Sequence, residues 1–200
     1  MTTQIKQTVK EQCKKAFEAS RSLISLSTTH KNDILRKMAD SLIQNCDHIL
    51  MENKKDLVAG KEIGTSDYLL DRLKLDEVRL EGIAESIRTV STLEDPIGEI
   101  ISKWTRPNGL KISKIRVPLG VIGMIYEARP NVTADAASLT FKTGNSVVLR
   151  GSSSAYRSNK AIIDAIKTTL QENGVNPDCI QLLEDTTRES VKDFVTMNEY

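Results

Sequence analysis

The apolar positions of residues 1–95 recur at helical spacing, with short polar segments between them. The first stripe comprises Ile5, Val9, Cys13, Ala16, Phe17, Leu23 and Ile24. After the polar break at residues 27–29, a second stripe comprises Ile34, Leu35, Met38, Leu42, Ile43, Cys46, Ile49 and Leu50. A further helix follows Asp76, a residue type that favours the N-cap position. Recurrence at intervals of three and four residues predicts amphipathic helices whose stripes pack into a core.

The period changes near Pro96, after which two short runs suit β-strands. Residues 97–104 and 110–117 flank the segment Arg-Pro-Asn-Gly at 106–109. Its proline presets the first torsion of a turn, and Gly109 can take the left-handed position that closes a hairpin. Apolar and charged residues share both faces of the second arm, so its alternation is imperfect, but we expect one face to be buried.

From residue 117 onward, strands alternate with helices. Apolar runs that suit buried strands occupy residues 121–126, 146–150 and 179–183, and helices are expected at 132–142, 155–173 and 187–197. Gly144 and Gly174 are suited to end the first two of these helices. This βαβαβα order predicts right-handed crossovers and a parallel sheet with helices on its faces. The fold class is therefore α/β, with a helical front region, a β-hairpin and a Rossmann-like sheet.

The charge and composition of the chain argue against several classes of partner. The chain has 28 Lys and Arg against 27 Asp and Glu, a net charge of +1. So small a net charge creates no electrostatic field that would attract nucleic acid or an anionic membrane. Only 4% of residues are aromatic, which disfavours stacking on bases or sugars. The longest apolar runs fall far short of the ~20 residues that a membrane span needs. Residues 1–15 carry no apolar signal segment.

The cysteines and histidines give no sign of a metal site. Cys13, Cys46 and Cys179 are odd in number and far apart, which argues against a disulfide scaffold or a zinc site and fits a reduced compartment. His30 and His48 fall in the helical front region, where a surface or core position is simpler than a catalytic one. We expect a cytoplasmic enzyme domain without a metal.

Ligands of an open parallel sheet collect outside the carboxyl ends of its strands, so the loops after Tyr126, Arg150 and Leu183 matter most. The first loop contains Arg129 and Asn131. An Asn amide is a fitting donor to an oxyanion in acyl transfer. The structural alternative is that Arg129 pairs with Glu127 and Asn131 caps the next helix. Spacing alone favours this alternative, because Asn is a leading N-cap residue.

The second loop region combines residues 142–145 with the small residues of 150–154. Small residues before a helix expose backbone N–H groups that can bind an anion. Arg150, at the strand end, is suited to pair with a phosphate such as the 2′-phosphate of NADP. The alternative is a helix-ending Gly-Asn turn followed by a serine N-cap. No GxGxxG or GxxxxGK[ST] pattern supports the nucleotide interpretation.

The third loop, residues 184–188, offers Thr186 or Thr187 as the cap of the following helix. A contact with the nicotinamide half of a cofactor is the sharper alternative for these threonines.

Together these segments resemble one enzyme family. Residues 117–133, Val-Pro-Leu-Gly-Val-Ile-Gly-Met-Ile-Tyr-Glu-Ala-Arg-Pro-Asn-Val-Thr, closely resemble the signature of the gamma-glutamyl phosphate reductases, in the aldehyde dehydrogenase superfamily. Residues 142–151 and 183–189 look like the next two blocks of that family, and the hairpin with Trp104 also fits. The Pro-Leu-Gly-Val-Ile-Gly part is general to aldehyde dehydrogenases, and Tyr-Glu-Ala-Arg-Pro-Asn narrows the resemblance to this reductase.

The resemblance implies an activity and a set of site residues. The family makes L-glutamate 5-semialdehyde from L-glutamyl 5-phosphate with NADPH, on the route from glutamate to proline. A cysteine thiolate displaces phosphate, and the resulting thioester accepts hydride. Carried onto this chain, the resemblance makes Asn131 the oxyanion donor and Arg129 a substrate-binding residue. The cofactor-binding residues that it implies are Lys142, Arg150, Gly151 and Ser152.

The resemblance also implies how the chain is organised and where it departs from the family. Residues 1–95 are expected as the helical region, 96–117 as a hairpin of the oligomerisation type and 118–200 as the cofactor-binding region. Ser152 stands where many members have a second glycine. Members are longer, and we expect their nucleophile and catalytic domain to lie outside these 200 residues, which leaves the chain inactive alone. None of the three cysteines is a credible substitute.

Partners and alternatives complete the expectations. The family implies a homo-oligomer, with glutamate 5-kinase as a pathway partner. A sheet of three strands leaves an exposed edge, so we expect poor stability or self-association. One alternative is a non-catalytic nucleotide-binding or interaction module, which would keep cofactor affinity without chemistry. A second is a dehydrogenase of free aldehydes, which residues 127–131 disfavour, since those enzymes usually carry another pattern there.

Overall fold

The computed structural model describes the backbone of residues 2–200 and the side chains of residues 8–200. Its front region is helical, as predicted, and comprises α1 (Thr2–Leu23), α2 (Thr28–Gln44), α3 (Cys46–Glu62), α4 (Asp67–Leu73) and α5 (Glu77–Thr92). Polar caps start two of these helices. The Ser27 hydroxyl accepts from the His30 amide at 3.2 Å, and the Asp76 carboxylate accepts from the Arg79 amide at 2.9 Å. The predicted cap at Asp76 is confirmed.

The second half alternates strands and helices in the predicted order. The strands are β3 (Val121–Ile125), β4 (Ser146–Arg150) and β5 (Ile180–Leu182), and they form a parallel sheet in that spatial order. The helices are α6 (Pro130–Lys142), α7 (Tyr156–Glu172) and α8 (Arg188–Phe194), with short 3-10 turns η1 (Ser153–Ala155) and η2 (Pro177–Cys179). Gly144 and Gly174 follow α6 and α7 with φ of 69° and 72°, as expected of helix-ending glycines.

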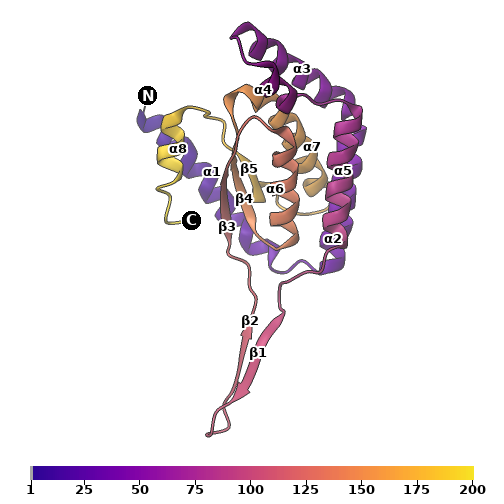
Figure 1. Ribbon diagram of the computed structural model, residues 1–200. Coiled ribbons are helices and arrows are strands. Elements are labelled where there is room, and N and C mark those ends of the chain that lie inside the picture. The colour runs from indigo at the N-terminus through magenta and orange to yellow at the C-terminus, as the bar shows by residue number, and fades with distance from the viewer. Residues whose placement is uncertain (1) are drawn as a thin grey trace.

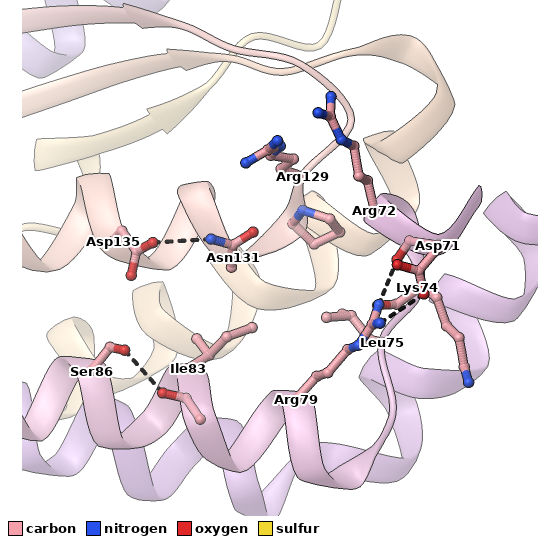
Figure 2. Close-up of a pocket in the computed structure, with 12 residues that line it drawn as sticks. Asp71, Arg72, Lys74, Leu75, Arg79, Ile83, Ser86, Arg129, Asn131 and Asp135 are labelled. Atoms are coloured by element: carbon pink, nitrogen blue, oxygen red, sulfur yellow. Dashed lines mark hydrogen bonds and ion pairs between the residues drawn. The ribbon is translucent and has the colours of Figure 1, made fainter. Parts of the chain in front are cut away.

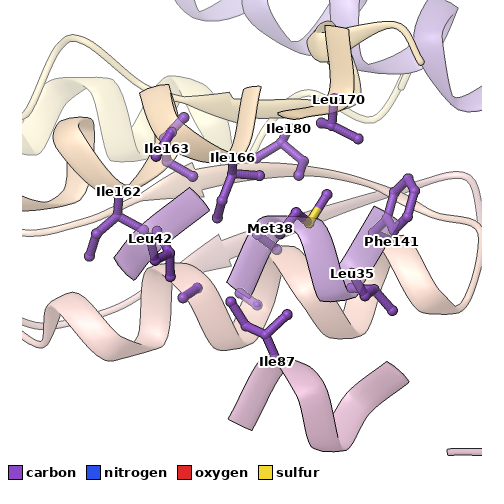
Figure 3. Close-up of a cluster of buried hydrophobic side chains, with 14 of the residues drawn as sticks. Leu35, Met38, Leu42, Ile87, Phe141, Ile162, Ile163, Ile166, Leu170 and Ile180 are labelled. Atoms are coloured by element: carbon purple, nitrogen blue, oxygen red, sulfur yellow. The ribbon is translucent and has the colours of Figure 1, made fainter. Parts of the chain in front are cut away.

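Helices cover both faces of the sheet (Figure 1). α1 contacts all three strands and α8, while α6 and α7 pack on the opposite face, with α2 and α5 outside them. The main core draws its buried side chains from the front helices and the sheet region alike, among them Leu35, Met38, Leu42, Ile87, Phe141, Ile162, Ile166 and Ile180 (Figure 3). Each such side chain contributes about 1.5–3 kcal/mol when fully buried. The helical front region therefore folds onto the sheet as part of one core.

The hairpin differs from the sequence expectation in one respect. β1 (Ile100–Thr105) and β2 (Lys111–Ile115) pair antiparallel, and Gly109 closes the turn at a φ of 85°. The ribbon projects away from the body of the molecule, and no helix or other strand covers it (Figure 1). Its side chains are exposed on both faces except for the half-buried Ile112, and Trp104 is 46% exposed. The expectation of one buried face was wrong, because alternation indicates burial only where another layer packs on the strand.

β3 also differs, because it lies at the edge of the sheet. Among the described residues it pairs only with β4, and Ile125 remains 47% exposed, whereas Val147, Val148 and Leu149 of β4 are fully buried. The apolar run predicted a strand correctly, but it did not predict an edge position. The free edge of β3 matches the exposed edge expected of a three-stranded sheet.

Candidate functional site

The loops that follow the three strands lie side by side at the carboxyl edge of the sheet, as the sequence predicted. The Tyr126 amide donates to the carbonyl of Arg150 at 3.1 Å, and the Leu183 amide donates to the carbonyl of Leu149 at 2.8 Å. Parallel pairing therefore continues past the strand ends and brings three polar segments to one edge. This edge is where ligands bind in open α/β sheets.

A buried polar network supports this edge from beneath. The Tyr126 hydroxyl lies 2.7 Å from the Thr133 hydroxyl, which in turn donates to the Asn159 side-chain oxygen at 2.9 Å. Burial raises the pKa of the Tyr126 phenol to about 12, so it stays protonated and can donate. A Cβ on Gly151 would stand 2.3 Å from the Asn159 Nδ2. Close packing against this network is thus a structural reason for glycine at position 151.

The first of two clefts at this edge lies between the start of α6 and the helices α4 and α5 (Figure 2). Its volume is about 460 Å³. Arg129 is the N-cap residue of α6 without a side-chain hydrogen bond, Pro130 occupies the first turn, and Asn131 and Asp135 line the wall. The Asn131 Nδ2 donates to the Asp135 Oδ2 at 3.2 Å. The structure therefore brings the predicted residues Arg129 and Asn131 into one cleft.

Both structural alternatives for this loop prove wrong. Asn131 lies inside the first turn of α6, because Arg129 takes the N-cap position and Pro130 the first helical one. Glu127 pairs with Arg72 of α4 at 3.2 Å, and no ion pair joins it to Arg129 among the described residues. That contact bridges residues far apart in the sequence, which local spacing cannot predict.

The second cleft, of about 370 Å³, lies between α3 and the start of α7. Ser153, Ser154 and Arg157 line it from the α7 side, and Glu184 lines it from the third loop. The exposed guanidinium of Arg157 forms no hydrogen bond or ion pair with any described residue. Sequence reasoning passed over Arg157. Its position one turn after a run of small residues is the signal that would have found it.

Two features of the second cleft explain its shape. The Ser152 hydroxyl accepts from the Ser154 amide at 3.3 Å, which confirms the serine cap proposed as the structural alternative. The Asp56 carboxylate accepts from the Ser158 amide at 2.8 Å and from its hydroxyl at 2.7 Å. Burial raises the pKa of Asp56, and the hydrogen bonds from Ser158 oppose that rise. These contacts fix the start of α7 against α3.

Arg150 is at the carboxyl edge, but its side chain faces the third loop. Its Nη2 donates to the backbone carbonyls of Thr186 at 2.5 Å and Thr187 at 3.1 Å. The Thr187 hydroxyl accepts from the Ser190 amide at 3.3 Å, so the predicted threonine cap of α8 is confirmed. Arg150 and Asn131 thus share one edge without facing the same cleft, and Arg150 braces the loop that leads into α8.

Lys142, another predicted cofactor residue, is not brought to this edge. It ends α6, and its Nζ donates to the Asn32 side-chain oxygen at 2.6 Å and to the Ser91 carbonyl at 3.1 Å. The Lys31 ammonium donates to the Lys142 carbonyl at 2.9 Å and pairs with Asp95. Burial lowers the pKa of Lys142. Lys142 therefore lies opposite the carboxyl edge, because a helix that follows one parallel strand ends beside the start of the next.

The three cysteines lie away from both clefts. Burial raises the pKa of Cys13 to about 11 and that of Cys179 to about 12, so both thiols are protonated at neutral pH. Cys46 starts α3 and is half-buried, and burial also raises its pKa. The described part of the chain has no group of three or more His, Cys, Asp or Glu side chains placed to hold a metal ion. None of its helices is both long and apolar enough to cross a membrane.

This arrangement defines an α/β protein with two clefts at the carboxyl edge of a parallel sheet and a projecting hairpin. The profile of the aldehyde dehydrogenase family matches residues 1–200, and the chain belongs to that family.

Three relatives of the chain are gamma-glutamyl phosphate reductases. The chain is 54% identical over 187 residues to the gamma-glutamyl phosphate reductase of Bacillus mycoides, which covers 94% of this chain and 45% of that protein. The Clostridium perfringens protein of that name is 56% identical, with the same coverage. The crystal structure of gamma-glutamyl phosphate reductase from Thermotoga maritima matches with a TM-score of 0.94 and 39% identity, over 96% of this chain and 46% of that chain. The chain thus spans less than half the length of these relatives.

Proposed function

We propose that this chain belongs to an NADPH-dependent gamma-glutamyl phosphate reductase, which reduces L-glutamyl 5-phosphate to L-glutamate 5-semialdehyde and phosphate on the route to proline. The observation that carries the proposal is the high identity to proteins of that name, together with the close structural match to one of them. The two clefts at one edge of the sheet suit such a reaction, since it needs a cofactor and an acyl substrate side by side.

The second cleft is the proposed site for the phosphate-bearing end of NADPH. Arg157 forms no ion pair or hydrogen bond through its guanidinium with a described residue, although the carboxylates of Glu52 and Asp56 interact with it electrostatically. The small residues Ser153 and Ser154 leave the backbone before α7 open to an anion. We assign the 2′-phosphate to Arg157, because the Nη2 of Arg150 donates to the carbonyls of Thr186 and Thr187 and so directs that guanidinium toward the third loop. Arg150, Gly151 and Ser152 then hold the loops around the cleft. NADPH supplies the hydride when bound.

The first cleft is the proposed site for the acyl phosphate. The exposed Arg129 makes no hydrogen bond or ion pair through its guanidinium, so it is free to meet the phosphate. The Asn131 amide is the proposed donor to the oxygen that becomes negative when the acyl carbon is attacked.

The covalent step needs a thiolate, and no cysteine of this chain is suited to provide it. Cys13 and Cys179 are buried with raised pKa values, and Cys46 lies on α3 outside both clefts. We propose that the nucleophile comes from outside these 200 residues and that the complete enzyme is a cytoplasmic homo-oligomer, with glutamate 5-kinase as its pathway partner. The exposed apolar side chains of the hairpin, including Trp104, support its role in oligomer contacts.

Cofactor titration tests this proposal. The chain should bind NADPH saturably, and the change in NADPH fluorescence on binding measures the affinity. Arg157→Ala should weaken NADPH binding by about ten-fold or more and leave NADH binding unchanged, because a charge-assisted contact contributes about 1.5–3 kcal/mol. Arg116→Ala is the matched control, because it removes an exposed arginine that lies just after β2, in the hairpin and away from the second cleft. The absence of saturable NADPH binding would refute the proposed cofactor site, and an unchanged affinity in Arg157→Ala would refute the role of Arg157.

Turnover is the second test. The chain alone should neither reduce glutamyl phosphate nor oxidise the cyclised semialdehyde with phosphate and NADP, because the covalent route lacks its thiolate. Turnover at rates usual for such enzymes would show that one of the three cysteines, or another group of this chain, acts as nucleophile.

A further inference from the structure

The first cleft contains a carboxylate that no cation neutralises. Asp135 lies on α6 and is half-buried, and its one hydrogen bond is the 3.2 Å contact from the Asn131 amide. No described lysine, arginine or histidine forms an ion pair with it. In the same cleft, Asp71 is paired with Arg79 at 2.7 Å. Asp135 is therefore an anion that faces a cleft and lacks the positive partner usual for a desolvated carboxylate.

A helix-capping role does not explain Asp135. The favourable effect of an acid at a helix N-terminus is confined to the first turn, and α6 begins at Pro130. Burial raises the pKa of Asp135, with only the hydrogen bond from Asn131 opposing the rise. The folded chain alone therefore gains little from keeping this carboxylate charged.

Three polar side chains line the wall of this cleft that α6 forms. Arg129 stands at the start of α6, Asn131 follows, and Asp135 lies one turn further along (Figure 2). Residues four apart on a helix have Cβ atoms about 5–6 Å apart. The wall therefore has a cationic end at Arg129 and an anionic end at Asp135, with an amide between them.

We propose that Asp135 binds the α-ammonium group of the amino-acid substrate. The inference rests on the proposed function, since it names the group that recognises the far end of the same substrate. With the acyl phosphate at Arg129 and Asn131, the carbon backbone of the substrate extends along the wall. Its α-carbon then lies one helical turn away, near Asp135. The ammonium hydrogens then replace the Asn131 amide as donors to Asp135. This exchange frees the Asn131 Nδ2 to donate to the acyl oxygen.

This arrangement gives Asp135 a role in specificity. A substrate that lacks the α-amino group would leave the carboxylate of Asp135 bonded to Asn131 and would keep that amide from the acyl oxygen. Recognition of the amino group and positioning of the acyl group are thereby coupled through one hydrogen bond.

A pair of stable probes tests the role of Asp135. L-Glutamine carries the α-ammonium group, and glutaramate is the same molecule without it. The wild-type chain should bind L-glutamine about ten-fold more tightly than glutaramate, measured by amide chemical shifts in NMR titrations. Asp135→Asn should abolish this preference, and Asp164→Asn, on the exposed face of α7, should retain it.

The possible outcomes separate this inference from the proposed function. Equal affinity of the wild-type chain for the two probes, or no saturable shift at Asn131 and Asp135, would overturn the inference, and this comparison needs no variant. A preference that persists in Asp135→Asn would overturn it as well. NADPH binding reports on the cofactor site separately, so its loss with the probe preference intact would count against the proposed function alone.

Discussion

Gly151→Ala is the substitution whose effect the structure defines most sharply. A Cβ at position 151 would lie 2.3 Å from the Asn159 Nδ2 and 3.1 Å from the ring of Tyr126. Gly151 is not among the glycines with positive φ, so alanine meets no backbone strain there. Asn159 is fully buried and held by the hydroxyl of Thr133. The side chain that must move is therefore enclosed, and the conflict is one of packing.

The magnitude follows from two costs and one gain. Overpacking of an enclosed site costs about 1–3 kcal/mol. Displacing Asn159 would break its hydrogen bond with Thr133, at about 1 kcal/mol more. Alanine in place of glycine returns about 0.4–1 kcal/mol by restricting the unfolded chain. We expect a net destabilisation of about 2–3 kcal/mol, a large part of the 5–15 kcal/mol typical of a domain.

Urea unfolding followed by far-UV circular dichroism measures this effect. Gly82→Ala is the matched control, because Gly82 lies inside α5 with open space where its Cβ would be. The control should be stabilised by about 0.5–1 kcal/mol, since glycine is a poor helix former. If Gly151→Ala unfolds within about 0.5 kcal/mol of the wild type, the packing argument is refuted.

Three further predictions follow from burial and from the sheet edge. A thiol reagent should label Cys46 first in the folded chain, and Cys13 and Cys179 only on unfolding, because burial keeps the latter two protonated; equal labelling rates would contradict this. The folded-state pKa of Tyr126, about 12 against an ordinary 10.0, favours the protonated form, so its contribution to stability is complete below pH 10 and lost as the pH rises from about 10 to 12. Tyr126→Phe should unfold in urea with less dependence on pH over that range, and an unchanged slope would rule out this linkage. The free edge of β3 should give concentration-dependent association in sedimentation velocity, whereas a stable monomer at every concentration would show that the edge is protected.

The residues proposed to hold the cofactor show how far sequence reasoning reached. The small residues after β4 predicted a site at the edge of the sheet where the second cleft lies, because strand ends and helix starts are local features. The choice among cations was not local. Arg150 donates hydrogen bonds to the carbonyls of Thr186 and Thr187, and Lys142 donates one to Asn32, which is 110 positions away in the sequence. Arg157, which the sequence analysis did not single out, lines the second cleft without a hydrogen bond or ion pair through its guanidinium to any described residue.

The sequence by itself predicted a helical front region, the strands and helices that follow in their order, the cap at Asp76 and a threonine cap for α8. Each of these depends on residues within a few positions of one another, and their periodicity and capping chemistry are written along the chain. The sequence did not predict α4 or the break between α2 and α3. The tertiary structure alone decided which charges remain unpaired, which strand lies at the edge and whether the hairpin is covered. Those properties arise when distant segments come together. Arg72 forms an ion pair with Glu127, and Asp135 accepts a hydrogen bond from the Asn131 amide but forms no ion pair with a described residue. Pairing across such separations depends on the packing of the whole chain.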